Sequence, residues 1–497
     1  MKKNILLLST VLLFSFFISY NAQSQNKRLT LEEAIETAKE NSIEAYANKH
    51  MFRYAYWRHK AYQASYLPKV DVSSNLFNLN RSISKFQVLE NNEWIDKWAE
   101  TNSLNSDLGL SVSQLIPWTG GRISMASGLN RTDLLNGDPA AFRSTPIGIS
   151  YHQPLFSYNE YKWEKILSPM DYEMAKKNYI KGVETVTSTA IDKFFNLLLA
   201  QETLKSTKSN RSKRDTLYLI AQGRYRMGTI DKADLMQMEQ EYLMSVNKVT
   251  NDSLDLLIKQ KDFSSFMGFK QGIKFDLIYS VVLPEIYINV EEAIQLAKNN
   301  GTEMLGFQKS LLESQQGLEQ EKANNRFNAD LNLNYGLTQQ GTDLSQAYSD
   351  PRISQGVNVS LRIPVLDWGR RKGRVKMARS QLELREVQIR QDSIDFEQGF
   401  FLQVSQFNLL QDDFILRAKT DSISMIRFDI TIKKYLKGQV DILKVNEVIA
   451  SKDAAKRNYI NAIRGFWTSY YGIRRTTLYD FVKKVDLVAD FDKVADN

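Results

Sequence analysis

Side chains that could carry enzymatic chemistry are scarce in this sequence. It has no cysteine, which excludes thiolate catalysis, disulfides and cysteine-ligated metals. Its three histidines, His50, His59 and His152, are scattered, which favours surface or packing positions over a metal cluster. Neither a nucleophile elbow nor a phosphate-binding loop is present. We therefore predict that the protein is not an enzyme and binds no metal.

Charged side chains are abundant but mixed in sign. The chain has 65 Lys and Arg against 57 Asp and Glu, a formal net charge of +8 over 497 residues. Because both signs are interleaved along the predicted helices, they indicate solvated helix faces, and a nucleic-acid-binding stripe is the alternative. We therefore expect no nucleic acid partner.

The first 24 residues are typical of a secretory signal peptide. Lys2 and Lys3 precede an apolar run, and small residues end at Ser24, after which we expect cleavage. A retained membrane anchor is the alternative, although the run is shorter than the roughly 20 residues that a span requires. With no cysteine after the signal, we expect no N-terminal lipid.

Two similar turns, 225–231 and 435–441, are separated by 210 residues, the offset from Gly228 to Gly438. Each interrupts a proline-free run whose apolar residues recur at helical spacing, so each predicts the tip of a hairpin between long helices. One glycine turn is weak evidence, but a matched pair indicates an internal duplication. The shared positions are aromatic, glycine, β-branched and acidic: Tyr225, Gly228, Ile230 and Asp231, then Tyr435, Gly438, Val440 and Asp441.

A second matched pair, 29–35 and 288–294, supports the duplication. Its offset is 259 residues, so the first copy holds about 49 extra residues between its helices. Thr30 and Glu33 have the spacing of a capping box, which predicts a helix from Thr30 to about Tyr66.

These matches divide the chain. We predict a signal peptide at 1–24, a first repeat at 25–284, a second repeat at 285–478 and a C-terminal tail at 479–497. The first repeat would contain strands at about 70–153 and a long helical hairpin at 158–269. The second would contain strands at about 329–363 and a long helical hairpin at 370–475. Prolines are expected at the junctions of barrel and helices, where neither a helix nor a strand has to contain them: Pro68, Pro154 and Pro364. Segments 82–105 and 337–352 are expected to be exposed loops.

Between the helices the apolar period becomes two, which is typical of strands with one apolar and one polar face. A soluble sheet would need a layer over its apolar face, whereas lipid can meet that face in an outer membrane barrel. A turn at 118–121 and weak alternation at 123–129 predict an extra β-hairpin, and whether it joins the sheet is left open. The clearest alternating residues are Leu108, Leu110, Val112, Ile147, Ile149, Tyr151, Ala329, Leu331, Leu333, Val357, Val359, Leu361 and Ile363.

Four strands, or six with the extra hairpin, are too few for a single-chain transmembrane barrel, which needs at least about eight. Three chains would supply twelve or eighteen. The long helices would each extend about 100 Å. The first of them has an 11-residue apolar repeat, and such helices can lie side by side around a wide tube, with an ordinary long bundle as the alternative.

The sequence resembles the TolC-like outer membrane efflux proteins over essentially all of the mature chain. The resemblance is carried by the 29–35 start, the 153–156 junction, the helix start at 369–371 and both Tyr-x-x-Gly tips. It implies a fold of mainly α with β structure, in which a homotrimeric transmembrane β-barrel joins a periplasmic α-helical barrel. It also implies a passive exit duct of a tripartite efflux or type I secretion system in a Gram-negative outer membrane, which would use no cofactor because a partner supplies the energy. The implied partners are outer membrane lipid, a periplasmic adaptor (membrane fusion) protein and an inner membrane RND or ABC transporter.

By the same resemblance, both tips would dock with the adaptor or transporter, and a helix turn without a partner is the alternative. Some family members carry acidic side chains that ring the entrance and bind cations. The corresponding residues just beyond the second tip are Asp441, Lys444 and Glu447, where Lys444 interrupts the acidic set. Asp231 and Asp234 at the first tip are the alternative contributors to such a ring. N-capping or solvated-face roles are the alternatives for these carboxylates. For the whole chain, the alternative function is a non-channel periplasmic coiled-coil scaffold or adaptor.

Overall fold

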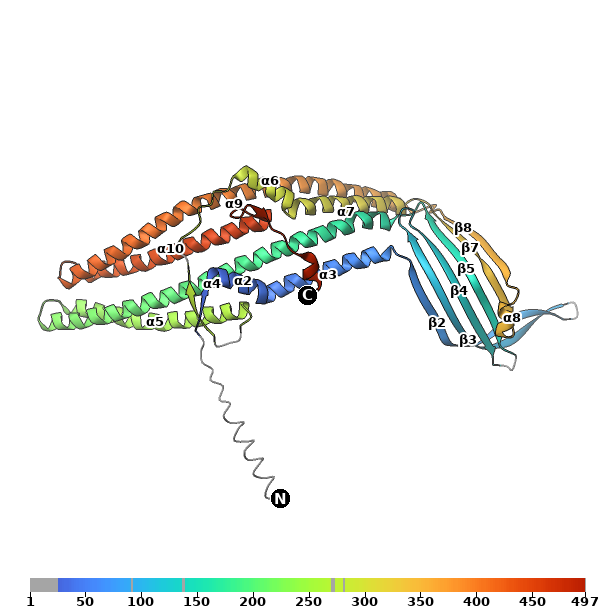
Figure 1. Cartoon of the computed structure of the whole chain (residues 1–497), viewed down its shortest axis with the longest axis horizontal. Helices are drawn as coiled ribbons and strands as arrows, with labels where there is room; N and C mark the ends of the chain where they lie inside the picture. Colours follow the sequence, from blue (N-terminus) through green and yellow to red (C-terminus); the bar gives the residue numbers. More distant parts are fainter. Residues whose placement is uncertain (1–25, 91–92, 136–138, 270–272, 280–281, 497) are drawn as a thin grey trace, which may run out of the picture. The chain divides into compact units, whose positions relative to one another are not determined.

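The computed structural model describes residues 26–90, 93–135, 139–269, 273–279 and 282–496 (Figure 1). The predicted signal peptide lies outside them. The chain forms two compact units, which we describe separately. Unit 1 takes its residues from Met1–Phe52, Lys176–Thr302 and Asp395–Asn497, and unit 2 from Arg53–Ala175 and Glu303–Ile394. Each unit draws on both predicted repeats, so the limits of the repeats stay a prediction about the sequence.

The order of elements repeats along the chain, as the matched segments predict: a helix pair, antiparallel strands and a long helical hairpin. The first copy contains β1 (Asn26–Thr30), α2 (Leu31–Asn41), α3 (Ile43–Ser65), β2 (Lys69–Glu90), β3 (Glu93–Ile116), β4 (Gly121–Leu134), β5 (Ala141–Leu155), α4 (Glu160–Arg226), α5 (Lys232–Phe266) and β6 (Lys274–Ile278). The second contains α6 (Val290–Asn300), α7 (Glu303–Asn324), β7 (Asn328–Gly341), α8 (Leu344–Tyr348), β8 (Arg352–Arg362), α9 (Arg370–Leu436) and α10 (Ile442–Thr477). The segments β9 (Tyr479–Asp480), β10 (Val485–Asp486) and α11 (Phe491–Asp496) follow.

The two long helices have the same length, because α4 and α9 each contain 67 residues. Both agree with the helices predicted from the apolar period. The expectation that prolines avoid helix interiors is wrong for Pro169, which lies inside α4. A helix this long tolerates the loss of one backbone hydrogen bond, because the remaining ladder and its packing hold the neighbouring turns.

The helix predicted from Thr30 to about Tyr66 is divided in two. The capping box at its start is confirmed, since the Thr30 hydroxyl accepts from the Glu33 N–H at 3.2 Å and the Glu33 carboxylate accepts from the Thr30 N–H at 2.9 Å. The break is at Ser42, whose Oγ accepts from the Ala45 N–H at 3.0 Å. Serine favours this capping role over a helix interior, and here it ends α2 and starts α3.

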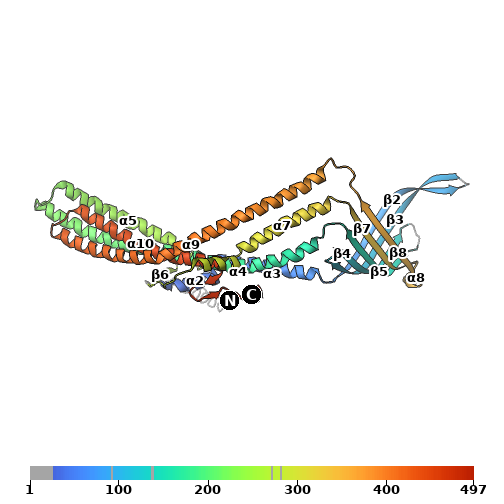
Figure 2. The same cartoon turned by 90° about the horizontal axis from the view of Figure 1, so that it is seen from above.

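Unit 1 is built on a core of apolar side chains from α2, α4, α9 and α10. The rings of Phe194, Phe407 and Phe466 are fully buried in it. The short strands β1 and β6 pair in parallel and add Leu29 and Leu277 to the same core. The two long hairpins lie side by side (Figures 1 and 2).

The predicted C-terminal tail begins with residues tied firmly into unit 1. Arg474 donates from Nη1 to Asp480 Oδ2 at 2.9 Å and from Nη2 to Glu184 Oε1 at 3.0 Å. The Tyr470 hydroxyl donates to Asp480 Oδ1 at 2.8 Å. Both carboxylates are buried. Burial raises the pKa of the Glu184 carboxyl, an effect that the Arg474 guanidinium opposes. These contacts connect α4 to α10 and to the strand that follows it.

Unit 2 contains a six-stranded antiparallel sheet in the order β2-β3-β4-β5-β7-β8. The extra hairpin therefore joins the sheet, because β4 pairs with both β3 and β5. The prediction of a loop at 82–105 is wrong: β2 and β3 pair as far as Glu90 and Glu93, and their cross-strand hydrogen bonds compensate for the polar composition. The second predicted loop, 337–352, includes the end of β7 and the helix α8.

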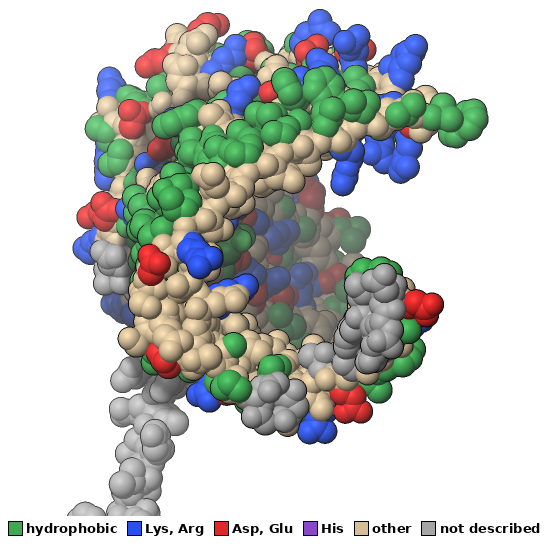
Figure 3. Space-filling model, turned by 90° about the vertical axis from the view of Figure 1, so that its right-hand side faces the viewer, with side chains coloured by type: hydrophobic (Ala, Val, Ile, Leu, Met, Phe, Trp, Pro, Cys, Tyr) green, Lys and Arg blue, Asp and Glu red, His purple; other side chains and the backbone are tan. Residues whose placement is uncertain are grey.

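The two faces of this sheet differ in chemistry. On one face, directly opposed pairs are apolar, as Val72 is with Leu110 and Leu333 with Val357. The intervening pairs on the other face are polar, as Asn332 is with Asn358. Figure 3 shows hydrophobic side chains along much of the outer face of the curved sheet, and mainly other side chains and backbone in its hollow. Although apolar, Val72 and Val357 are 72% and 76% exposed.

No helix of the described residues has the combination of length and hydropathy needed to cross a membrane.

Candidate functional site at the helical hairpin tips

The two predicted tips have nearly identical backbones. Gly228 and Gly438 have φ angles of 71° and 72°, in the left-handed region that glycine adopts without strain. The Gly228 N–H donates to the Tyr225 carbonyl, and the Gly438 N–H to the Tyr435 carbonyl, both at 2.9 Å. These bonds satisfy carbonyl groups that a helix end leaves open. The glycines thus end α4 and α9 in the same way.

Asp231 and Asp441 are helix N-caps. Asp231 Oδ1 accepts from the Asp234 N–H at 2.8 Å, and Asp441 Oδ1 accepts from the Lys444 N–H at 2.9 Å. Both have extended backbones, as N-caps usually do. This geometry starts α5 and α10 immediately after the turns, so each tip is short and held at both ends.

A small apolar core lies behind the tips. It contains Met238, Phe428, Tyr435 and Val445, among others, and Ile230 and Val440 pack against it. The two tip tyrosines differ, because Tyr435 is 7% exposed and Tyr225 is 41% exposed. Burial raises the pKa of the Tyr435 phenol, which is therefore neutral. The tips thus combine a packed interior with an exposed ring at Tyr225.

Arg224 joins one tip to the other. Its Nη2 donates to the Leu436 carbonyl at 3.2 Å and to the Tyr435 carbonyl at 3.4 Å. The guanidinium carbon also lies 5.5 Å from the centre of the Tyr435 ring. A cation is favoured at the carbonyl end of a helix. Arg224 directly precedes the tip predicted at 225–231, and nothing in the sequence indicates that it reaches α9, because that contact spans 212 residues.

Three of the four carboxylates of the possible charge ring, those of Asp231, Asp441 and Glu447, have hydrogen-bond partners within the chain. Besides the two caps, Glu447 accepts from Lys444 Nζ at 2.6 Å and from Arg427 Nη2 at 2.5 Å. The hydrogen bonds from Lys444 and then from Arg427 lower the pKa of the Glu447 carboxyl. Among the described residues, no group of three or more His, Asp or Glu is arranged to hold a metal ion. A ring formed between copies of the chain stays a prediction.

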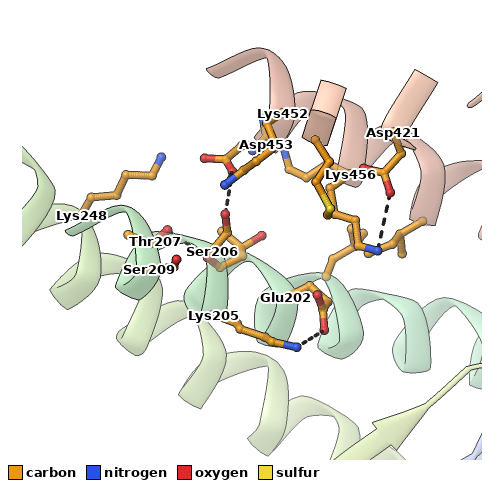
Figure 4. A pocket seen from close by; sticks show the side chains of 15 residues that line it. Glu202, Lys205, Ser206, Thr207, Ser209, Lys248, Asp421, Lys452, Asp453 and Lys456 are labelled. Atoms are coloured by element: carbon orange, nitrogen blue, oxygen red, sulfur yellow. Dashed lines mark hydrogen bonds and ion pairs between the residues drawn. The ribbon is translucent and has the colours of Figure 1, made fainter. Parts of the chain in front are cut away.

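A polar layer above the tips aligns α4 with α10 (Figure 4). Asp453 accepts from the Ser206 hydroxyl at 2.6 Å and from Asn210 Nδ2 at 2.8 Å. Lys452 donates to Asn210 Oδ1 at 3.2 Å. Ser206, Lys452 and Asp453 border a cavity of about 360 Å³ that Lys248 also lines. Because such bonds need matched partners, the layer sets the register of the two helices and so the level of their tips.

The predicted junction residues all lie in unit 2, away from the tips in sequence. Pro68 directly precedes β2, and Pro364 follows the end of β8. Pro154 was expected beyond the last strand of the first copy, but it lies inside β5, opposite Asp330. Only one further residue of β5 follows it, so the missing N–H costs the ladder little.

Comparisons with known proteins agree with this architecture. Residues 293–470 match the family model of the outer membrane efflux protein. The outer membrane channel CmeC of Campylobacter jejuni is similar in structure, with a TM-score of 0.64 and 13% identity over 93% of this chain and 88% of that one. The outer membrane protein VceC of Vibrio cholerae gives a TM-score of 0.61 and 10% identity over 90% and 95%.

A third similar structure is the MtrE outer membrane channel of Neisseria gonorrhoeae, with a TM-score of 0.59 and 11% identity over 92% of this chain and 91% of that one. No curated protein sequence matches the chain. At these identities the structural likeness establishes the fold, which is that of TolC-like channels.

Proposed function

Because this chain carries the outer membrane efflux protein domain and has the fold of outer membrane channels, we propose that it is the outer membrane channel of a tripartite efflux or type I secretion system. It would form a homotrimer and act as a passive exit duct from periplasm to exterior, catalysing no reaction. The signal peptide would direct it across the inner membrane, and it would carry no lipid anchor.

The observation that carries this proposal is the two-faced sheet of unit 2. Large apolar side chains such as Val72, Val357 and Val359 are exposed along one face, while the opposite face is polar. Exposed apolar surface of this extent is costly in water and stable against lipid. A polar inner face would meet a water-filled lumen.

The tips support the second part of the proposal, docking to a periplasmic adaptor and an inner membrane RND or ABC transporter. Met227 and Leu443 are exposed beside rigid, capped turns, with Tyr225 close by in sequence. Apolar and aromatic residues on a rigid frame are typical of sites that bind a partner helix. The adaptor would open the duct by separating the tips, and the transporter would supply the energy.

The test is planar-bilayer conductance of the detergent-purified mature protein, with its mass measured in the same detergent. Small, steady currents from a trimer would support the channel. A monomeric, water-soluble protein that does not insert would overturn it and favour a periplasmic coiled-coil scaffold or adaptor.

A further inference from the structure

The six-stranded sheet of unit 2 ends in two strands that pair on one side only. In the described part of the chain, β2 pairs with β3 and β8 pairs with β7, and neither has a strand on its outer edge. In lipid each unsatisfied backbone N–H or C=O costs several kcal/mol, so spanning sheets are closed. The sheet of one chain therefore needs another strand at both edges.

The two edges are complementary in direction. Every neighbouring pair from β2 to β8 is antiparallel, and the sheet has an even number of strands. The strands β2 and β8 therefore run in opposite directions. The β8 edge of one copy can pair with the β2 edge of the next in the same antiparallel pattern, and repetition of this contact closes a ring.

Directly opposed residues are staggered along the strands from one edge of the sheet to the other. The chain enters β2 at Lys69 and leaves β8 at Arg362, both next to helical segments of unit 2. A path of directly opposed cross-strand residues that starts at Lys69 reaches β8 at Gly356, six residues before Arg362, where β8 ends. The residues on this path are Lys69, Ser113, Ser124, Ser150, Asn334 and Gly356.

This stagger can be converted into an angle. Six residues of strand rise about 20 Å, and five inter-strand steps span about 24 Å. If the strand ends next to the helices, Lys69 of β2 and Arg362 of β8, lie in one plane across the barrel, the strands tilt by about 40° from the barrel axis. Transmembrane barrels have tilts of about 35–45°. The stagger of this sheet thus matches the tilt of such a barrel.

We propose that three copies close an eighteen-stranded barrel in which β8 of each copy pairs with β2 of the next. The inference rests on the trimeric channel proposed above and adds the interface and the strand count. Aligning the helix-side ends places Val359 opposite Val72 on the apolar face. A slip of one residue would turn apolar side chains of one edge toward the polar face, so alternation on both edges restricts the register.

The extra hairpin determines the width of this barrel. Eighteen strands at this tilt give a backbone diameter of about 36 Å, against about 24 Å for the twelve strands that remain without β3 and β4. Barrels of 16–18 strands leave an aqueous channel. The membrane segment would therefore be as open as a porin, and restriction of passage would fall to the helical tips.

The chain has no cysteine, so introduced pairs are its only thiols. In reconstituted full-length protein, Val72→Cys with Val359→Cys should give covalent dimers and trimers with mild oxidation or a short bifunctional thiol reagent. The matched control, Ser73→Cys with Val359→Cys, puts the thiols on opposite faces and should give at least fivefold less product. Two further pairs, Val72→Cys with Val357→Cys and Val72→Cys with Leu361→Cys, test the neighbouring registers that keep both thiols on the same face of the sheet.

A third pair reports on the strand count. Met125 lies directly opposite Ile149 across β4 and β5, so Met125→Cys with Ile149→Cys should cross-link within one chain. Trimers that form both kinds of cross-link would support the proposal. If all three β2–β8 cysteine pairs give no more cross-linked product than the control in trimers, the proposed interface is wrong. If the Met125–Ile149 pair does not cross-link in trimers, the count of eighteen strands is wrong. Protein that neither assembles nor inserts would overturn the channel itself, a result separable from the other two by its mass.

Discussion

Arg224 Nη2 lies 3.2 Å from the carbonyl oxygen of Leu436, and this hydrogen bond joins the end of α4 to the end of α9. It is the most direct link between the two predicted docking tips in the described part of the chain. The link depends on one charged side chain and on carbonyl groups that the helix end leaves available. It can therefore be removed without disturbing the turns themselves.

Arg224→Ala should loosen the contact between the tips. A partly exposed, charge-assisted hydrogen bond of this kind contributes about 1 kcal/mol, so open states should become about fivefold more populated. Single-channel recording would show this as a higher open probability or conductance. Arg226→Ala is the matched control, because Arg226 Nε bonds within its own helix to the Gln222 carbonyl. Equal behaviour of the two variants would contradict the role of Arg224.

Substitution of the tip glycines should destabilise the turns through the backbone. Gly228→Ala and Gly438→Ala each force a side chain into the left-handed region, at a cost of about 1 kcal/mol, although a Cβ at either position meets no other atom within 4 Å. The measurement is the rate of proteolysis at the tips. Gly223→Ala is the control, because it lies inside α4 with open space around it and should slow cleavage or leave it unchanged. If none of the three changes affects cleavage, alanine does not strain these two turns.

Asparagine and alanine substitutions separate capping from charge at Asp231 and Asp441. Asparagine keeps the cap and removes the charge, whereas alanine removes both and should cost about 1 kcal/mol per site. If a charge ring lines the entrance, the double asparagine variant should lose cation selectivity in bilayers while keeping its thermal stability. Unchanged selectivity would leave capping as the sole role of these carboxylates.

Arg474→Met should be strongly destabilising. It leaves Glu184 and Asp480 buried without their shared cation, a change that typically costs about 3–5 kcal/mol. The double variant Arg474→Met with Glu184→Gln should recover part of this loss. Thermal unfolding of the detergent-solubilised protein would measure both, and full stability of the single variant would contradict the account of this network.

The same variant should depend on pH in a defined direction. Burial already raises the pKa of Glu184 above its usual 4.5, and removing Arg474 removes a cation that opposes that rise. A carboxyl whose folded-state pKa is raised favours folding at low pH, and this advantage is lost as pH rises through the raised value. As the pH is raised from 5 to 8, the midpoint of thermal unfolding should therefore decrease more for Arg474→Met than for the wild type. A parallel decrease in both proteins would contradict this prediction.

Features that depend on neighbours in the chain could be predicted from the amino-acid sequence. The capping box of Thr30 and Glu33, the left-handed turns at Gly228 and Gly438 and the two-residue period of the strands are all local, and their duplication predicted the order of elements. Each was predictable because backbone preference and periodicity act over a few residues.

Features that join distant segments became visible only in the folded protein. The inclusion of β4 in the sheet, the reach of Arg224 to Leu436 and the network of Arg474 with Glu184 bring together residues far apart in the chain. Weak alternation at 123–129 could not reveal β4 as a sheet member, because its place depends on cross-strand pairing with both β3 and β5. Ser42, by contrast, is a local feature that the apolar pattern did not reveal: it ends a helix that this pattern would continue, since its hydroxyl caps the next one.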